Sequence, residues 1–232
     1  MVKQVVRLFA VLMVVALMPI TSSAQFAIGG GVSSLLQFGN SKPLVGANLL
    51  VEIPRNNDVT FYVRGQYLAP QSVNGDPIYM EAIARDPLTD PSFVPVKVFD
   101  QKRFGYFIFD GGTRYYLLNG YDEGFSVYGG SNVGVVISTV KYGYQSEDYN
   151  TSLYSLDLYN LDDYRGKGSI FGLAVGFTGG VKYTKPGIGT FFFDINPHLM
   201  MFAVPSSNTM PTDHHRNLIF TFNLGFRKEF YK

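Results

Sequence analysis

The histidines are the first residues to consider for catalysis, because an imidazole ring can act as a general base near neutral pH. His198 follows Asp194 by four residues, so in a β-strand both side chains would lie on the same face. A carboxylate can orient a histidine as a base, and Ser138 is predicted to point the same way. No His-x-Ser arrangement of the deacylase type is present. Two hypotheses therefore stay open: a catalytic centre at His198, or a histidine that only forms hydrogen bonds inside the fold.

Metal and cofactor sites have little support in the sequence. Asp213-His214-His215 are adjacent residues of one predicted loop, which supplies too few fixed ligands for a closed site. The chain has no cysteine, so it has no thiolate site, disulfide framework or acylated cysteine. The glycine runs 29–31 and 129–130 fall inside predicted strands, where glycine marks curvature or close packing. We therefore predict no catalytic residue, no metal and no cofactor.

The elements that would position these residues are strands with two different faces. In Val59–Tyr67 one face carries Val, Phe, Val and Tyr, and the other carries Thr, Tyr, Arg and Gln. A period of two indicates a strand with differently solvated faces. The pattern recurs in eight segments, and no linker divides them, so the chain from residue 25 to 232 is predicted to be one all-β domain. The predicted strands are 26–38, 44–53, 59–69, 104–117, 125–140, 169–184, 190–204 and 217–231.

The first 24 residues have the features of a signal peptide. Lys3 and Arg7 precede a short apolar run, and Ser22 and Ala24 are small residues suited to cleavage before Gln25. The run is shorter than the ~20 residues that a membrane helix needs. Loss of the leader lowers the 19 basic residues to 17 against 18 acidic ones. This near-neutral chain has no basic excess to attract nucleic acid.

Side-chain volume predicts which face of the sheet points outward. Eight strands closed into a barrel leave an interior only wide enough for ordinary side chains. The apolar face carries many Phe, Val, Leu and Tyr residues, whereas the opposite face is small or polar. We therefore predict an eight-stranded antiparallel up-and-down transmembrane β-barrel, with its apolar face against lipid.

The predicted lumen carries seven charges, which are tolerable in a narrow interior only when they are paired. We expect Lys182 to lie diagonal to Asp194, and Arg227 to reach the same carboxylate. The pairs would form a plug that closes the lumen, and an ion-selective pore is the alternative. The charges are Glu52, Arg64, Asp110, Arg114, Lys182, Asp194 and Arg227. Pro197 lies within a predicted strand, so we expect a bulge or local break near Pro197-His198.

Apart from the first external connection, 39–43, which is short, the connections alternate between short and long, as in outer-membrane barrels with tight periplasmic turns and longer external loops. The short ones are 54–58, 118–124 and 185–189; the long ones are 70–103, 141–168 and 205–216. An even number of strands places both termini on the periplasmic side. Five prolines, Pro70, Pro77, Pro87, Pro91 and Pro95, are expected to keep loop 70–103 out of the sheet.

Loop 141–168 interleaves tyrosines with acidic residues, and tyrosine is a favoured contact residue at interfaces. Either this loop binds a partner, or the flanking strands simply continue above the membrane as a hairpin. The candidates for binding are Tyr149, Tyr154, Tyr159 and Tyr164.

The eight strands, the lumenal charges and the end Gly225-Phe226-Arg227-Lys228-Glu229-Phe230-Tyr231 resemble the small outer-membrane β-barrel family. Its members include the outer membrane protein A and X barrels and the PorT-like barrels linked to type IX secretion. The resemblance implies that the last strand is read by the barrel assembly machinery. Gly225 and Phe230 match that signal, whereas Lys228 and Lys232 stand where aromatic residues are usual.

These observations predict a non-enzymatic integral outer-membrane barrel that presents loops 70–103 and 141–168. The loops would bind a partner, or the barrel would be a subunit of an envelope or secretion assembly. The expected partners are outer-membrane lipid, the assembly machinery and an envelope protein. A lipid-modifying enzyme centred on His198 and a narrow channel are the alternatives.

Overall fold

The computed structural model describes residues 25–37, 43–156, 166–205 and 217–230, so the predicted leader lies outside the described residues. In these residues no helix is long and apolar enough to cross a membrane. The chain forms strands instead. They are β1 (Phe26–Gln37), β2 (Leu44–Pro54), β3 (Val59–Ala84), β4 (Phe93–Tyr116), β5 (Gly124–Ser146), β6 (Tyr154–Leu156), β7 (Gly166–Lys185), β8 (Gly189–Pro205) and β9 (Leu218–Phe230).

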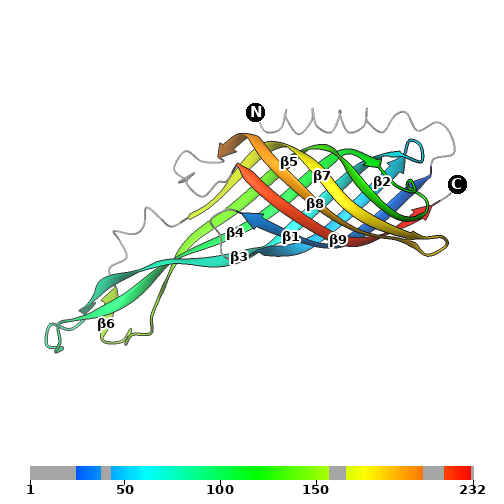
Figure 1. Ribbon diagram of the computed structural model, residues 1–232. Helices are drawn as coiled ribbons and strands as arrows, with labels where there is room; N and C mark the ends of the chain where they lie inside the picture. Colours follow the sequence, from blue (N-terminus) through cyan, green and yellow to red (C-terminus); the bar gives the residue numbers. More distant parts are fainter. Residues whose placement is uncertain (1–24, 38–42, 157–165, 206–216, 231–232) are drawn as a thin grey trace.

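Eight long strands form a closed antiparallel barrel. The hydrogen-bonded order is β2-β1-β9-β8-β7-β5-β4-β3, and β3 pairs back to β2 to close the ring. The short strand β6 lies outside the ring and pairs with the far end of β3 (Figure 1). The predicted eight-stranded up-and-down barrel is therefore confirmed. The bounds of β1, β2, β8 and β9 agree with the predicted ones to within one residue at each end.

The outer surface of the barrel is apolar, as the volume argument predicts. Leu49 and Phe177 on this face are 73% and 70% exposed. The alternate residues point inward and are buried, among them Asn48, Asn132, Thr221 and Asn223. In water this surface would form an exposed patch far larger than soluble monomers tolerate, whereas lipid would cover it.

The prediction that prolines keep residues 70–103 out of the sheet is wrong. β3 and β4 continue as one long hairpin beyond the barrel, and they stay paired from Gln71↔Phe104 to Ile83↔Phe93 (Figure 1). Pro70 and Pro77 fall at the two register shifts of this ladder, where a missing N–H is tolerated. We call this hairpin, together with the end of β5 and with β6, the arm.

The segment 141–168 combines the two expected structures. β5 continues to Ser146 and pairs with β4, while β7 begins only at Gly166, opposite Tyr142. Between β5 and β7 the chain forms the short strand β6, which pairs with Ala82–Ala84 of β3. The first residues of this segment, up to Ser146, therefore extend strand β5. Residues 154–156, in its middle, pair with the arm.

The expected break at Pro197 is present. The β7–β8 ladder pairs Gly176 with His198 and Gly179 with Ile195, and no pair is formed at Asn196 and Pro197 between them. The register is the same on both sides of this gap, so the break is no bulge. The register shift of this ladder lies further on, between Leu173 and Ala174.

Both ends of the described barrel lie at one rim. Phe26, at the start of β1, pairs with Phe230, at the end of β9. The three short connections 55–58, 117–123 and 186–188 close this same rim, and the arm projects from the opposite one (Figure 1).

Candidate functional site

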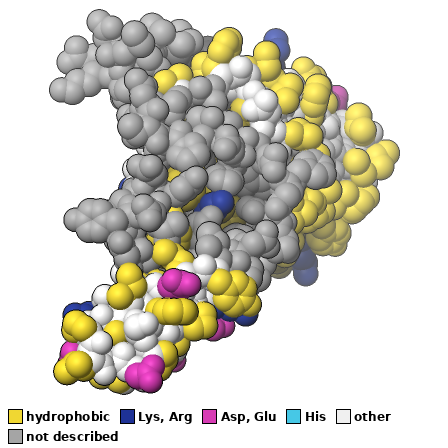
Figure 2. Space-filling view, turned by 90° about the vertical axis from the view of Figure 1, so that its left-hand side faces the viewer, with side chains coloured by type: hydrophobic (Ala, Val, Ile, Leu, Met, Phe, Trp, Pro, Cys, Tyr) yellow, Lys and Arg dark blue, Asp and Glu magenta, His cyan; other side chains and the backbone are white. Residues whose placement is uncertain are grey.

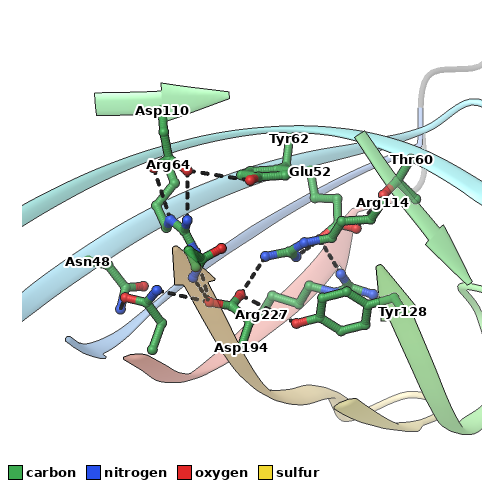
Figure 3. A network of polar contacts seen from close by, with 12 residues as sticks. Asn48, Glu52, Thr60, Tyr62, Arg64, Asp110, Arg114, Tyr128, Asp194 and Arg227 are labelled. Carbon is green, nitrogen blue, oxygen red and sulfur yellow. Dashed lines mark hydrogen bonds and ion pairs between the residues drawn. The ribbon is translucent and has the colours of Figure 1, made fainter. Parts of the chain in front are cut away.

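The middle of the lumen contains a chain of ion pairs whose charges alternate. Arg64 binds Asp110 and Asp194 at 2.6 and 2.9 Å. Arg114 binds Asp194 and Glu52 at 2.7 and 2.6 Å (Figure 3). Arg227 completes the chain by binding Glu52. Three arginines thus face three carboxylates, and all six side chains are at most 1% exposed.

Each carboxylate of this ion-pair chain also accepts hydrogen bonds from neutral groups. Glu52 accepts from Thr60 at 2.5 Å and from Tyr116 at 2.6 Å. Asp194 accepts from Asn196 at 2.6 Å and from Asn223 at 2.9 Å. Such additional bonds are what make a buried ion pair tolerable, because attraction between the charges alone rarely offsets desolvation.

Aromatic rings fill the space beside the arginines. The guanidinium carbon of Arg114 lies 4.5 Å from the ring centre of Tyr62 and 4.8 Å from that of Tyr128. The guanidinium of Arg227 lies 4.4 Å from the ring centre of Tyr121. Cation–π contacts of this kind are strongest when desolvated. Ion pairs and rings together close the lumen at this level, as the plug hypothesis predicts.

Lys182 lies diagonal to Asp194, as predicted, but the expected ion pair between them is not formed. Asp194 lies opposite Gly180, two residues from Lys182 along β7, but the lysine side chain extends toward the rim. Its ammonium group donates to the carbonyls of Tyr121 and Glu123, at 3.0 and 2.9 Å, and to Thr184 at 3.0 Å. Lys182 therefore anchors the short connection 117–123 and lies outside the ion-pair chain.

The partner predicted for Arg227 is also wrong. On β9 the residue opposite Asp194 is Asn223, which lies four residues from Arg227. Those four residues span roughly 13 Å of strand. On the other side of β9, Arg227 lies opposite Gly29 of β1, near Glu52 of β2. The stagger of β9 against its neighbours decides the partner of Arg227, and alternation along one strand does not reveal it.

Toward the arm, the lumen becomes apolar, which the sequence reasoning did not predict. Leu35, Leu68 and Ile219 are fully buried there, although they lie on the face expected to be polar. The signal was present as adjacent apolar residues, such as Leu35-Leu36 and Leu44-Val45, which make both faces of a strand apolar. This apolar layer caps the ion-pair chain. Its members are Leu35, Leu44, Leu68, Phe104, Tyr106, Ile108, Val136, Ala174, Met200 and Ile219.

His198 is fully buried between the ion-pair chain and the apolar layer. Neither ring nitrogen has a hydrogen-bond partner among the described residues. The predicted bond to Asp194 is not formed, since both oxygens of Asp194 are taken by arginine, asparagine and tyrosine side chains. The ring occupies space above Gly176, where a β-carbon would come within 3.2 Å of its Nδ1 atom. Ser138 is buried too, at 8% exposure, beside the apolar layer.

The far end of the arm has a small core of its own. Ala82, Val96 and Tyr154 are buried together, and Tyr149 packs against them. The hydroxyl of Tyr154 donates to the carbonyl of Pro91 at 3.1 Å, and the backbone N–H of Arg85 donates to Leu153 at 2.8 Å. Tyr154 is thus a packing residue, which corrects its predicted role in binding. Tyr149 is partly buried, and Tyr159 and Tyr164 lie outside the described residues.

The exposed residues of the arm tip combine apolar and acidic side chains (Figure 2). Residues 79–99 and 147–156 carry five acidic and two basic side chains, which gives a net charge of −3. Around them lie large exposed apolar side chains, and Leu88 is 91% exposed. Sequence reasoning missed these apolar residues because it assigned the segment to a loop. They are Tyr79, Ile83, Leu88, Phe93 and Leu153.

No three His, Asp or Glu side chains of the described chain are grouped so that they could hold a metal ion. Asp213-His214-His215 lie outside the described residues. The two residues predicted as an assembly signal lie on β9. Gly225 faces the ring of Phe192 in the lumen, and Phe230 stacks on Phe26 with ring centres 5.4 Å apart.

The barrel is similar to solved bacterial structures. Neisserial surface protein A matches with a TM-score of 0.50 and 11% identity, over 90% of this chain and 98% of that one. This is the fold of the small outer-membrane β-barrels. The Ail protein of Yersinia pestis matches with a TM-score of 0.46, 14% identity and coverage of 89% and 100%. OprG of Pseudomonas aeruginosa matches with a TM-score of 0.42 and 10% identity, over 90% of this chain and 97% of that one. No protein-family model and no curated protein matches the sequence.

A barrel with this fold has two parts that could act. The ion-pair chain and the apolar layer are both buried inside the lumen. The arm has a packed core of its own, projects from one rim and exposes apolar side chains. The arm is therefore the better candidate for a functional site.

Proposed function

We propose that this outer-membrane barrel is a non-enzymatic anchor whose arm binds a protein partner of the envelope. The observation that carries the proposal is the exposed apolar and acidic surface on a tip that already has a packed core. Exposed apolar groups on a preformed surface favour binding because little ordering is needed on association. The net charge of the tip favours a partner with a basic, apolar surface. A subunit of an envelope or secretion assembly would have this kind of contact.

The tip can be tested without disturbing the barrel. The triple variant Tyr79→Ser/Leu88→Ser/Phe93→Ser removes three exposed side chains of the tip. We expect the variant to fold and to lose the proteins that co-purify with the wild type from native membranes after crosslinking. Ile188→Ser is the control, because Ile188 is 49% exposed at the opposite rim. Retention of the same proteins by the triple variant would rule out the tip as the binding surface.

We also propose that the arm is outside the cell and that both termini are periplasmic. The support is that the chain ends share a rim with the three short connections, which is the periplasmic arrangement in bacterial barrels. Protease added to intact cells should therefore cut the arm. Epitope tags at 55–58 and 186–188 should stay hidden until the outer membrane is opened. Labelling of those tags on intact cells would show the opposite orientation.

Two other functions are less well supported. A channel requires a path through the ion-pair chain and the apolar layer, and steady conductance in a planar bilayer would favour it. A lipid-modifying enzyme requires lipid to reach His198, which is fully buried within the lumen. A changed envelope lipid profile in His198→Ala cells, with the barrel still folded, would favour the enzyme.

A further inference from the structure

Three basic side chains lie next to one another across three strands at the base of the arm. Arg103 of β4 is directly opposite Lys141 of β5, and Lys141 is directly opposite Lys167 of β7. All three are exposed, and none forms an ion pair with another described residue. Like charges directly opposite in a sheet repel each other, because their β-carbons are only about 5 Å apart. An anion bound across this basic row would remove that repulsion.

The basic row lies just beyond the apolar outer surface of the barrel. On the same outward face, the row Phe107–Ile137–Phe171 is apolar, and the next row toward the arm is Gly105–Thr139–Ser169. The basic row follows, so it lies four residues, or roughly 13 Å of strand, beyond the apolar one. With strands tilted by about 40°, this distance is roughly 10 Å along the membrane normal. Lipid headgroups occupy about this zone, since they add several ångströms to each side of the hydrocarbon core.

The surface between these rows is hollowed. A depression of about 450 Å³ is lined by all three basic residues and by Thr139 and Ser169. An arginine can bind a phosphate through two N–H groups, and lysines act as point charges beside it. The two hydroxyl residues lie between the basic row and the apolar row. One molecule with acyl chains and a phosphate would match the order of these rows.

We propose that the row Arg103–Lys141–Lys167 binds the phosphate of a lipid headgroup in the leaflet on the arm side of the membrane. A lipid is favoured over a soluble phosphate because the row faces sideways, directly above the apolar rows. The acyl chains of the lipid lie against Phe107 and Phe171, while its phosphate lies in the depression. This binding site goes beyond the proposed partner binding at the tip, and it holds the base of the arm at a fixed height in the membrane.

The site can be tested with purified protein in neutral detergent. The probe is a phosphatidic acid, and the readouts are bound lipid by native mass spectrometry and the temperature at which the folded gel band is lost. We expect the lipid to bind the wild type and to raise that temperature. The variant Arg103→Gln/Lys141→Gln/Lys167→Gln should bind it more weakly by on the order of a hundredfold, because each basic residue near an anionic lipid contributes about fivefold. Equal binding by this variant would overturn the proposal.

The control variant Arg55→Gln/Lys185→Gln/Lys228→Gln removes three exposed charges near the opposite rim. It should keep most of the binding, and an equal loss in both variants would show general attraction and no site. Diacylglycerol, which lacks the phosphate, should leave the folded band unchanged. A rise with inorganic phosphate alone, as large as with the lipid, would indicate a soluble anion and overturn the lipid assignment. If the triple variant does not fold, Lys141→Gln alone must weaken binding, since Lys141 is the middle residue of the row.

Discussion

Asp194→Ala is expected to destabilise the folded barrel by about 3–5 kcal/mol, because it breaks two buried ion pairs at once. Arg64 and Arg114 both bind this carboxylate, and both are fully buried. In the variant each arginine keeps one carboxylate, Asp110 or Glu52, but its remaining N–H groups lose their acceptor.

The measurement is equilibrium unfolding in denaturant with the protein in lipid or detergent. Far-UV circular dichroism and the heat-dependent gel shift report the folded fraction, because the chain has no tryptophan to follow by fluorescence. Glu147→Ala is the matched control. It removes the Lys97–Glu147 pair on the arm, whose 3.6 Å contact joins side chains that are 31% and 55% exposed. We expect a loss of at most about 1 kcal/mol there.

A double-mutant cycle separates the observed ion-pair chain from the one expected from the sequence. Asp194 and Arg114 should be coupled, so the double variant should lose less than the sum of the single losses. Asp194 and Lys182 share no contact, and their effects should add. Coupling between Asp194 and Lys182, or an unchanged unfolding midpoint for Asp194→Ala, would contradict the geometry.

Alternation was sufficient to predict the barrel, because the period of two is a property of single strands. It identified the eight strands and the lipid-facing side, and it identified the seven buried charges. The ion-pair partners depend on the stagger between strands, which leaves no trace in a single strand. Thus Arg227 is correctly predicted to lie in the lumen, but its partner is Glu52 and not Asp194. Lys182 lies diagonal to Asp194 as predicted, yet it binds the carbonyls of a short connection that no strand pattern describes.

The arm was missed for a different reason. Proline generally interrupts β-structure, yet Pro70 and Pro77 lie where the register of a two-stranded ladder shifts. A proline costs little at such an irregularity, because bulges tolerate a residue without a backbone donor. The small core around Tyr154 joins it to Ala82 and Val96, which lie 72 and 58 positions away in the sequence, and no local pattern predicts such packing.

Gly130→Ala is expected to destabilise the barrel by about 1–3 kcal/mol, which is typical of overpacking in a well-packed interior. Gly130 faces the lumen on β5, where β4 approaches so closely that a β-carbon would overlap the carbonyl oxygen of Thr113. The same β-carbon would lie 3.3 Å from the Cα atom of Arg114. The two strands must therefore move apart, and this movement displaces an arginine that binds both Glu52 and Asp194.

Gly179→Ala is the matched control for this glycine, because Gly179 lies on the neighbouring strand β7, opposite Gly129. Its β-carbon would meet no atom within 4 Å. Alanine there restricts the unfolded chain without straining the folded one, so stability should stay the same or rise by up to about 1 kcal/mol. Equal losses in the two variants would mean that glycine acts through flexibility of the strand. A loss confined to Gly130→Ala would show that the narrow lumen needs glycine on its inner face to bring β4 and β5 together around Arg114.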